Sequence, residues 1–236
     1  MKTATLARLE SLLQARRLDT TLRRFDAAPG PLAITTGVAA VDRVLGGGWR
    51  RGEVSEIVGP RSSGRTSLLL STCAAATAGG GLVGFVDAVD RFDPVGAAEA
   101  GVDLDRVLWV RGPSLTVESA RPDVVGQAVH RALRALDLIV RAGGFAVAVL
   151  DVADVPARGL RTLPWTTWLR LAHANEGRDT VCLLAGETAM GRSARGVSLA
   201  LAPAPRWSGT SVQSRRFDGF DLASAADRQA AWRSRA

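Results

Sequence analysis

Residues Gly59 to Thr66 have the residue types and the spacing of a loop that binds phosphate. They follow an apolar, strand-like run at 54–58 and precede a helix-forming run at 67–76. Glycines let the backbone curl so that N–H groups point inward, and the start of the helix adds unpaired N–H groups and a positive dipole end. The pattern therefore predicts a nucleotide-binding P-loop formed by Gly59, Pro60, Arg61, Ser62, Ser63, Gly64, Arg65 and Thr66.

Two side chains of this loop determine its chemistry. The hydroxyl of Thr66 is suited to hold Mg²⁺. Arg65 stands where the P-loop pattern has lysine, a compact cation that fits between the β- and γ-phosphates, whereas arginine is a wider planar fork. Two interpretations follow: a nucleotide site with an altered cation, or a P-loop scaffold that no longer hydrolyses, or no longer binds, a nucleotide.

A second chemical position is Asp151, which ends the apolar run 145–150. An apolar strand that ends in aspartate, well after a P-loop, is typical of a Walker B motif. Thr66 and Asp151 are then the candidate ligands of a Mg²⁺ ion, Asp151 acting through water. The alternative is an aspartate that caps the following segment. With two histidines and two cysteines far apart, the chain shows no other metal-site spacing.

Strand-like and helix-like runs alternate along the chain, which predicts an α/β fold with a central, mostly parallel sheet flanked by helices. The continuous apolar runs are typical of strands buried on both faces. The expected strands are 54–58, 82–87, 107–110, 145–150, 180–185 and 197–202. The expected helices are 5–24, 67–76, 94–100, 124–141 and 164–174, with a short helix before residue 46.

Composition limits the class of protein. The chain has 236 residues, 47% of them hydrophobic, which suits one α/β domain. It lacks an apolar run long enough for a membrane span and a signal-peptide core, and Cys73 and Cys182 lie in apolar runs as reduced residues. We therefore expect a cytoplasmic protein without membrane partners.

The net charge of +7 lies entirely on the two ends. Residues 1–24 carry six cations and two anions, residues 206–236 carry six cations and three anions, and the residues between them are neutral. This distribution favours terminal segments that bind something acidic, such as nucleic acid or an acidic protein surface. The alternative is that the charges only solvate helical tails.

From residue 36 to about residue 111 the chain resembles the RecA recombinase family. The shared motifs are Thr36-Gly37, Leu45-Gly46-Gly47-Gly48, Arg51-Gly52-Glu53, the P-loop, Phe85-Val86-Asp87-Ala88, Asp93-Pro94 and Ala100-Gly101-Val102-Asp103. The resemblance implies a RecA-like P-loop core at 29–205. It leaves an N-terminal amphipathic helix with its linker at 1–28 and a basic C-terminal segment at 206–236.

The chain departs from the family at four positions that handle ATP. Val89 stands where the family has the glutamate that polarises the attacking water, so the resemblance implies no catalytic residue there. Arg65 replaces the P-loop lysine, Gly96 replaces the aromatic residue that stacks on adenine, and Glu187 replaces the glutamine that senses the γ-phosphate. We expect little or no hydrolysis, with ATP and Mg²⁺ as cofactors only if the altered site still binds them.

The family's two DNA-binding loops are shortened to 152–163 and 188–196. The candidate DNA-binding residues in them are Arg158, Arg161, Arg192 and Arg195.

A short RecA-like chain with these departures is similar to ImuA, the accessory factor of the bacterial mutasome. That resemblance implies a role in the SOS-type damage response and mutagenic translesion synthesis. The implied partners are RecA and an ImuB-type relative of Y-family polymerases, with DNA and self-association as further expectations. The alternatives are a DNA-dependent ATPase of the recombinase type that forms filaments on single-stranded DNA, and a plain DNA-binding module.

Both ends of the chain are candidate partner-binding segments. In the N-terminal helix, Leu6, Leu9 and Leu13 form an apolar stripe that a neighbouring RecA-like subunit or the chain's own core would cover. In the C-terminal segment, Arg215, Arg216 and Trp232 are residue types enriched at interfaces. Residues 215–222 alternate partly like an edge strand, so the segment could instead complete the core.

Overall fold

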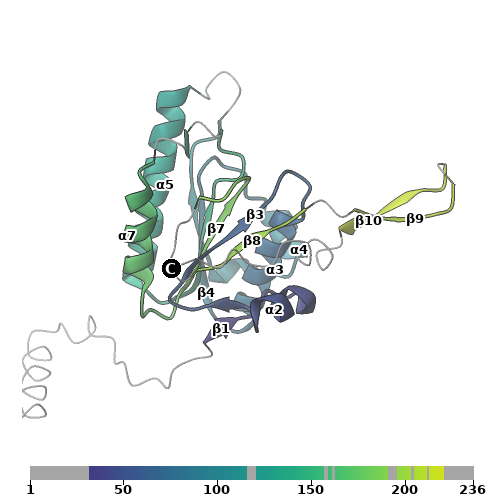
Figure 1. Cartoon of the computed structure of the whole chain (residues 1–236), viewed down its shortest axis with the longest axis horizontal. Helices are drawn as coiled ribbons and strands as arrows, with labels where there is room; N and C mark the ends of the chain where they lie inside the picture. Colours follow the sequence, from purple (N-terminus) through teal and green to yellow (C-terminus); the bar gives the residue numbers. More distant parts are fainter. Residues whose placement is uncertain are drawn as a thin grey trace, which may run out of the picture. The chain divides into compact units, whose positions relative to one another are not determined.

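The structure is a computed structural model that describes residues 32–115, 121–156, 159–160, 163–190, 196–202, 205–211 and 213–220. The described residues, which begin at Leu32, belong to one compact unit. The architecture is α/β, as the sequence predicts: a central sheet carries helices on both faces (Figure 1).

The central sheet has six strands in the order β5-β4-β6-β7-β3-β8, and each register pairing among them is parallel. The strands are β3 (Val54–Val58), β4 (Leu82–Asp87), β5 (Val107–Arg111), β6 (Phe145–Asp151), β7 (Val181–Gly186) and β8 (Ser198–Ala200). The expected strands 54–58, 82–87, 107–110, 145–150 and 180–185 are confirmed to within a residue. The expected strand 197–202 is shorter, because only its central residues pair with β3.

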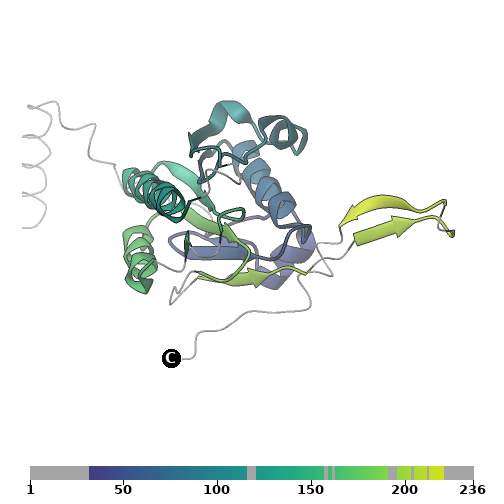
Figure 2. The same cartoon turned by 90° about the horizontal axis from the view of Figure 1, so that it is seen from above.

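Two groups of helices cover the two faces of the sheet (Figures 1 and 2). One group contains α2 (Ala39–Leu45), α3 (Arg65–Ala78) and α4 (Pro94–Glu99), and the other contains α5 (Pro122–Ala142) and α7 (Trp165–Asn175). A short 3₁₀ turn, η2 (Leu104–Arg106), leads into β5. Proline at the first turn starts α4 and α5, where its missing N–H costs nothing.

Alternate residues of the buried strands supply two hydrophobic cores, one on each face of the sheet. Val147 and Val149 pack with α2, α3 and α4, whereas Ala148 and Leu150 pack with α5 and α7. The free thiols of Cys73 and Cys182 are buried, one in each core. Burial on both faces explains why these strands are continuously apolar in sequence.

Two short antiparallel ribbons lie outside the six-stranded sheet. β1 (Ala33–Ile34) pairs with β2 (Trp49–Arg50), and β9 (Pro205–Ser208) pairs with β10 (Arg216–Phe220). The strand character expected for residues 215–222 is confirmed by β10. Its partner β9 was not expected, because Pro205–Ser208 has neither the apolar run nor the alternation of a strand.

Candidate functional site

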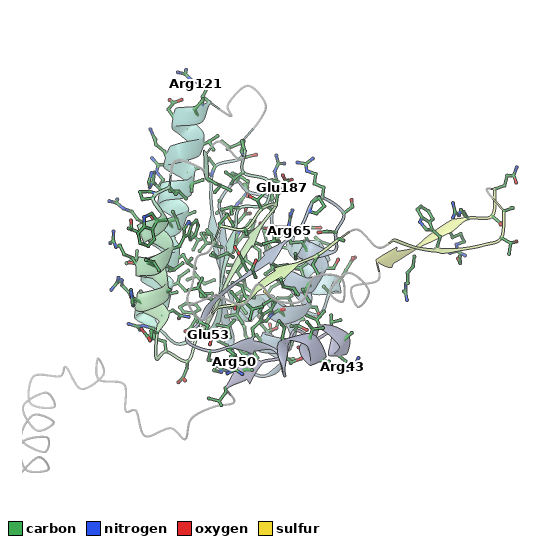
Figure 3. The ribbon with its side chains drawn as sticks, in the orientation of Figure 1. Arg43, Arg50, Glu53, Arg65, Arg121 and Glu187 are labelled. Atoms are coloured by element: carbon green, nitrogen blue, oxygen red, sulfur yellow. The ribbon has the colours of Figure 1, made fainter. Side chains whose placement is uncertain are left out.

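The ends of four parallel strands meet at the carboxyl edge of the sheet, where open α/β folds bind ligands. The register pairs Val58 of β3 with Gly186 of β7, and Asp151 of β6 with both Asp87 of β4 and Ala185 of β7. The P-loop leaves β3 at this edge. In Figure 3, Arg65 and Glu187 lie toward this end of the sheet and Glu53 lies toward the opposite end.

The P-loop backbone has the curled form that its glycines predict. Ser62 and Gly64 have positive φ angles of 60° and 87°, and Gly64 immediately precedes α3. Gly59 has no room for a side chain, since a Cβ there would come within 2.7 Å of the Leu201 carbonyl oxygen. Helix α3 has no side-chain N-cap and no acidic residue in its first turn, so its N–H groups and dipole favour an anion.

The side chain of Arg65 is turned back into the protein. It is 7% exposed, and its Nη1 donates to the carbonyl oxygens of Gly59 and Gly186, the latter at 3.1 Å. Its Nε is buried without a partner in the described part of the chain. Arg65 therefore joins the start of the P-loop to the end of β7, and its Nη1 is occupied by backbone carbonyl oxygens.

Asp151 lies half-buried at the same edge, and burial raises the pKa of its carboxyl group to about 6. One carboxylate oxygen accepts the N–H of Ala153 at 2.9 Å, so Asp151 does cap the segment that follows it. The positive charge of Arg65 acts against the rise in pKa, and Asp87 and Asp154 add to it. Thr66 is exposed in the first turn of α3 and makes no hydrogen bond to Asp151 in the described ranges. Asp151 thus has a structural role, and the Mg²⁺ role of the pair stays a prediction.

Val89 follows β4 by two residues, and its side chain lies in the apolar core beneath α5 and α7. It is 3% exposed and packs in the same cluster as Val86, Val125 and Leu150. The carboxylate of Asp87, before it, accepts N–H groups of Arg91 at 2.9 Å and Phe92 at 2.8 Å and so fixes the turn after the strand.

Asp90 lies in the turn after β4 and is paired with an arginine of the neighbouring strand. It makes two hydrogen bonds of 2.9 Å to the guanidinium of Arg111, which lowers the pKa of the Asp90 carboxyl group. The same guanidinium lies 4.6 Å from the ring centroid of Trp109. Sequence reasoning missed Arg111, because no pattern links residues 90 and 111 before β4 and β5 are known to be neighbours.

The two remaining positions at which the chain departs from the family are Gly96 and Glu187. Gly96 is inside α4, where a Cβ would come within 2.7 Å of the Asp93 carboxylate that caps the helix. An aromatic side chain at residue 96 would therefore have to displace that cap. Glu187 is exposed and directly follows β7.

A further ion pair crosses from the P-loop to the segment after β6. Arg61 Nη2 lies 2.9 Å from Asp154 Oδ1, with side chains 78% and 30% exposed. The pair contributes little to stability at this exposure. Its consequence is local: a P-loop cation is already bound to a carboxylate beside the site. The loop backbone thus fits a phosphate, whereas its two cations are directed to protein oxygens.

Several sequence-predicted residues lie outside the described residues. They are the candidate DNA contacts Arg158, Arg161, Arg192 and Arg195 and the candidate partner contacts Leu6, Leu9, Leu13 and Trp232. Arg215 and Arg216 are described, and both are exposed at the β9–β10 hairpin.

Within the described ranges, no three His, Cys, Asp or Glu side chains are grouped as a metal centre requires. No helix in those ranges has the length and apolarity that crossing a membrane demands.

The model of the RecA N-terminal domain matches residues 31–159, more than half of the chain. The chain belongs to this family. Its relatives include RecA proteins of Frankia alni (39% identity over 127 residues), Methylococcus capsulatus (43% over 119) and Sinorhizobium fredii (41% over 119). These matches cover 53%, 50% and 50% of the chain and 33%, 30% and 29% of the relatives. The chain thus spans about a third of the RecA proteins it matches. The family match at residues 31–159 contains the P-loop, Val89 and Asp151.

Proposed function

We propose that this chain is a RecA-like accessory protein in the DNA damage response, similar to ImuA, that assembles partners for mutagenic translesion synthesis and hydrolyses little or no ATP. The observation that carries the proposal is the burial of Val89 in the apolar core at the position where the family has its catalytic glutamate. A valine neither accepts a proton nor orients water.

The neighbouring carboxylates do not replace the missing glutamate. Asp87 is 1% exposed and accepts three backbone N–H groups, and Asp90 is paired with Arg111 at 2.9 Å. The oxygens of Asp87 are therefore occupied by backbone donors, and Asp90 is held against Arg111, so neither carboxylate is free to act as the general base. Loss of a general base costs about 10²-fold or more in rate, which would leave turnover close to background.

Arg65 supports the same proposal. A cation that stabilises the transferred phosphoryl group must reach the β- and γ-phosphates. The Arg65 guanidinium instead bonds the carbonyl oxygens of Gly59 and Gly186, so nucleotide binding would have to break those contacts first. If Mg-ATP binds, the loop N–H groups would hold phosphate and Thr66 and Asp151 would orient the metal, which would neutralise phosphate charge.

The second candidate function is a DNA-dependent ATPase of the RecA recombinase type that forms filaments on single-stranded DNA. The match to the RecA N-terminal domain over residues 31–159 favours it. The two candidates differ in one measurable property, which is the stimulation of ATP turnover by single-stranded DNA.

We extend the accessory role to its partners. RecA and an ImuB-type relative of Y-family polymerases are the proposed protein partners, with DNA binding and self-association as further proposed properties. Such a protein would act in the cytoplasm, where bacterial chromosomes lie. Pull-down of each purified partner with the full chain, and with a truncation that lacks residues 1–28, tests whether the N-terminal segment is an assembly element. Unchanged binding by the truncation would show that it is not.

The decisive experiment measures ATP turnover by the full chain with and without single-stranded DNA, beside a RecA protein under matched conditions. Asp151→Asn serves as the background control, because activity that survives it does not come from this site. The expected result is turnover at the Asp151→Asn background with no stimulation by DNA. Turnover comparable to that of RecA would refute the accessory proposal and favour the recombinase-type ATPase.

A further inference from the structure

The β9–β10 hairpin is a basic ribbon outside the central sheet. Within the described residues, β9 and β10 pair only with each other, in the register Arg216↔Ser208, Phe217↔Trp207 and Gly219↔Arg206. An irregularity between Phe217 and Gly219 places one extra residue in β10. A bulge of this kind increases the local twist of a ribbon and turns its side chains toward new directions.

Trp207 is 51% exposed on this hairpin, and the guanidinium carbon of Arg215 lies 5.8 Å from its ring centroid. A single exposed apolar residue is ordinary on a protein surface. A tryptophan together with a cation at its ring is more specific, because the pair offers a flat surface and a positive charge at one place. Strand alternation places Arg206 and Arg216 on the other face of the ribbon.

The charge of the hairpin points to an anionic ligand. Residues 205–220 contain Arg206, Arg215 and Arg216 against a single acid, Asp218, whereas residues 25–205 are neutral overall. The three arginines are exposed. An excess of positive charge on a short ribbon attracts a polyanion.

We propose that the β9–β10 hairpin binds single-stranded nucleic acid. Trp207 provides the surface on which an unpaired base stacks, Arg215 contacts the backbone beside it, and Arg206 and Arg216 contact phosphates along the other face. A base inside a duplex is stacked on its neighbours and cannot lie on an aromatic ring, so the exposed tryptophan selects single strands. Because the hairpin lies outside the central sheet, nucleic-acid binding there would not require ATP at the P-loop.

The test is a fluorescence anisotropy titration of a labelled thymidine oligonucleotide with the full chain across a range of salt concentrations. Trp207→Ala is expected to weaken binding about tenfold, as loss of one stacked base does. Trp165→Ala is the matched control, since Trp165 on α7 is 59% exposed, and it should change affinity by less than about twofold. Trp207→Phe keeps a ring and is expected to retain most of the affinity.

The arginines are tested by the salt dependence. The double variant Arg206→Ala/Arg216→Ala should reduce the slope of log affinity against log salt by about 1.4, because each phosphate contact on a single strand contributes about 0.7. The double variant Arg131→Ala/Arg134→Ala removes the same charge from exposed positions of α5 and should leave the slope unchanged.

Three outcomes would overturn the proposal. One is the absence of measurable oligonucleotide binding by the unmodified chain at low salt. Another is equal affinity of the Trp207→Ala and Trp165→Ala variants. The third is binding of a Y-family partner that the hairpin variants abolish while oligonucleotide binding stays intact, because the hairpin would then be a protein interface. Circular dichroism of each variant verifies its fold, and Trp207→Phe keeps the test decisive if Trp207→Ala fails to fold.

Discussion

The carboxyl edge of the sheet and the β9–β10 hairpin both contain arginines, but they use them in opposite ways. At the sheet edge Arg65 is 7% exposed and bonded to backbone carbonyls, and Arg61 is paired with Asp154. On the hairpin Arg206, Arg215 and Arg216 are exposed. A ligand that used the Arg65 guanidinium would have to break its contacts with backbone carbonyls, whereas the arginines of the hairpin lie at the surface. A family motif can thus keep its backbone shape while its charged side chains stabilise the fold.

Val89→Glu should have the largest effect on the stability of the protein. It would place a carboxyl group in the apolar core without a partner and lower the free energy of unfolding by about 3 to 5 kcal/mol. Val89→Ala, which only leaves a cavity, should cost about 1 to 2 kcal/mol. Urea denaturation of both variants is the measurement. Equal stability of Val89→Glu and the unmodified chain would mean that the edge can accommodate a catalytic carboxylate after all.

Arg65→Ala should destabilise the protein by about 1 to 3 kcal/mol, because two buried carbonyl oxygens lose a charged donor. Arg61→Ala is the matched control on the same loop and should cost less than about 1 kcal/mol, since its ion pair is exposed. Thermal unfolding by calorimetry compares the two. A larger loss of stability for Arg61→Ala would show that Arg61, rather than Arg65, is the arginine that stabilises this edge.

Asp151→Asn should stabilise the protein at neutral pH by about 1 to 2 kcal/mol. The pKa of Asp151 is raised to about 6 in the folded protein, from 3.8. Its ionisation therefore opposes folding, and stability falls as pH rises from about 4 to about 6. Denaturation of both proteins from pH 4 to pH 8 tests the sign: the curves should separate as pH rises and converge toward pH 4. A separation that grows toward low pH would contradict the burial argument.

Trp207→Ala should have the smallest effect on stability, changing the free energy of unfolding by less than about 0.5 kcal/mol, because the ring is half exposed on a ribbon outside the core. The same denaturation assay, run beside Arg65→Ala, sharpens the contrast between a structural edge and an exposed hairpin. A loss as large as that of Arg65→Ala would show that Trp207 belongs to the core.

The sequence predicts the fold well because the information is local. The apolar runs 82–87 and 145–150 are short and follow glycines, which favours buried strands over helices. The Gly59–Thr66 spacing determines the loop between strand and helix. The sequence does not predict β9, because Pro205–Ser208 is a strand only through its hydrogen bonds to β10 across a turn. Its own residue types carry little strand signal.

The candidate site is less predictable, because its decisive features are directions of side chains. The sequence identifies Arg65 as an altered cation, but only the pairing of β3 with β7 brings the Gly186 carbonyl within its reach. It identifies Val89 as a missing glutamate but does not reveal that the position is buried. The Asp90–Arg111 pair depends on the adjacency of β4 and β5, which local patterns do not encode.

The two cysteines have a practical consequence for experiments on this protein. Burial raises the pKa of both Cys73 and Cys182 to about 12, so neither thiol forms an appreciable amount of reactive thiolate at neutral pH. Maleimide dyes and spin labels should therefore leave the native chain unmodified. A cysteine introduced at an exposed position such as Ser208 would be the preferred point of attachment, without prior removal of the natural cysteines.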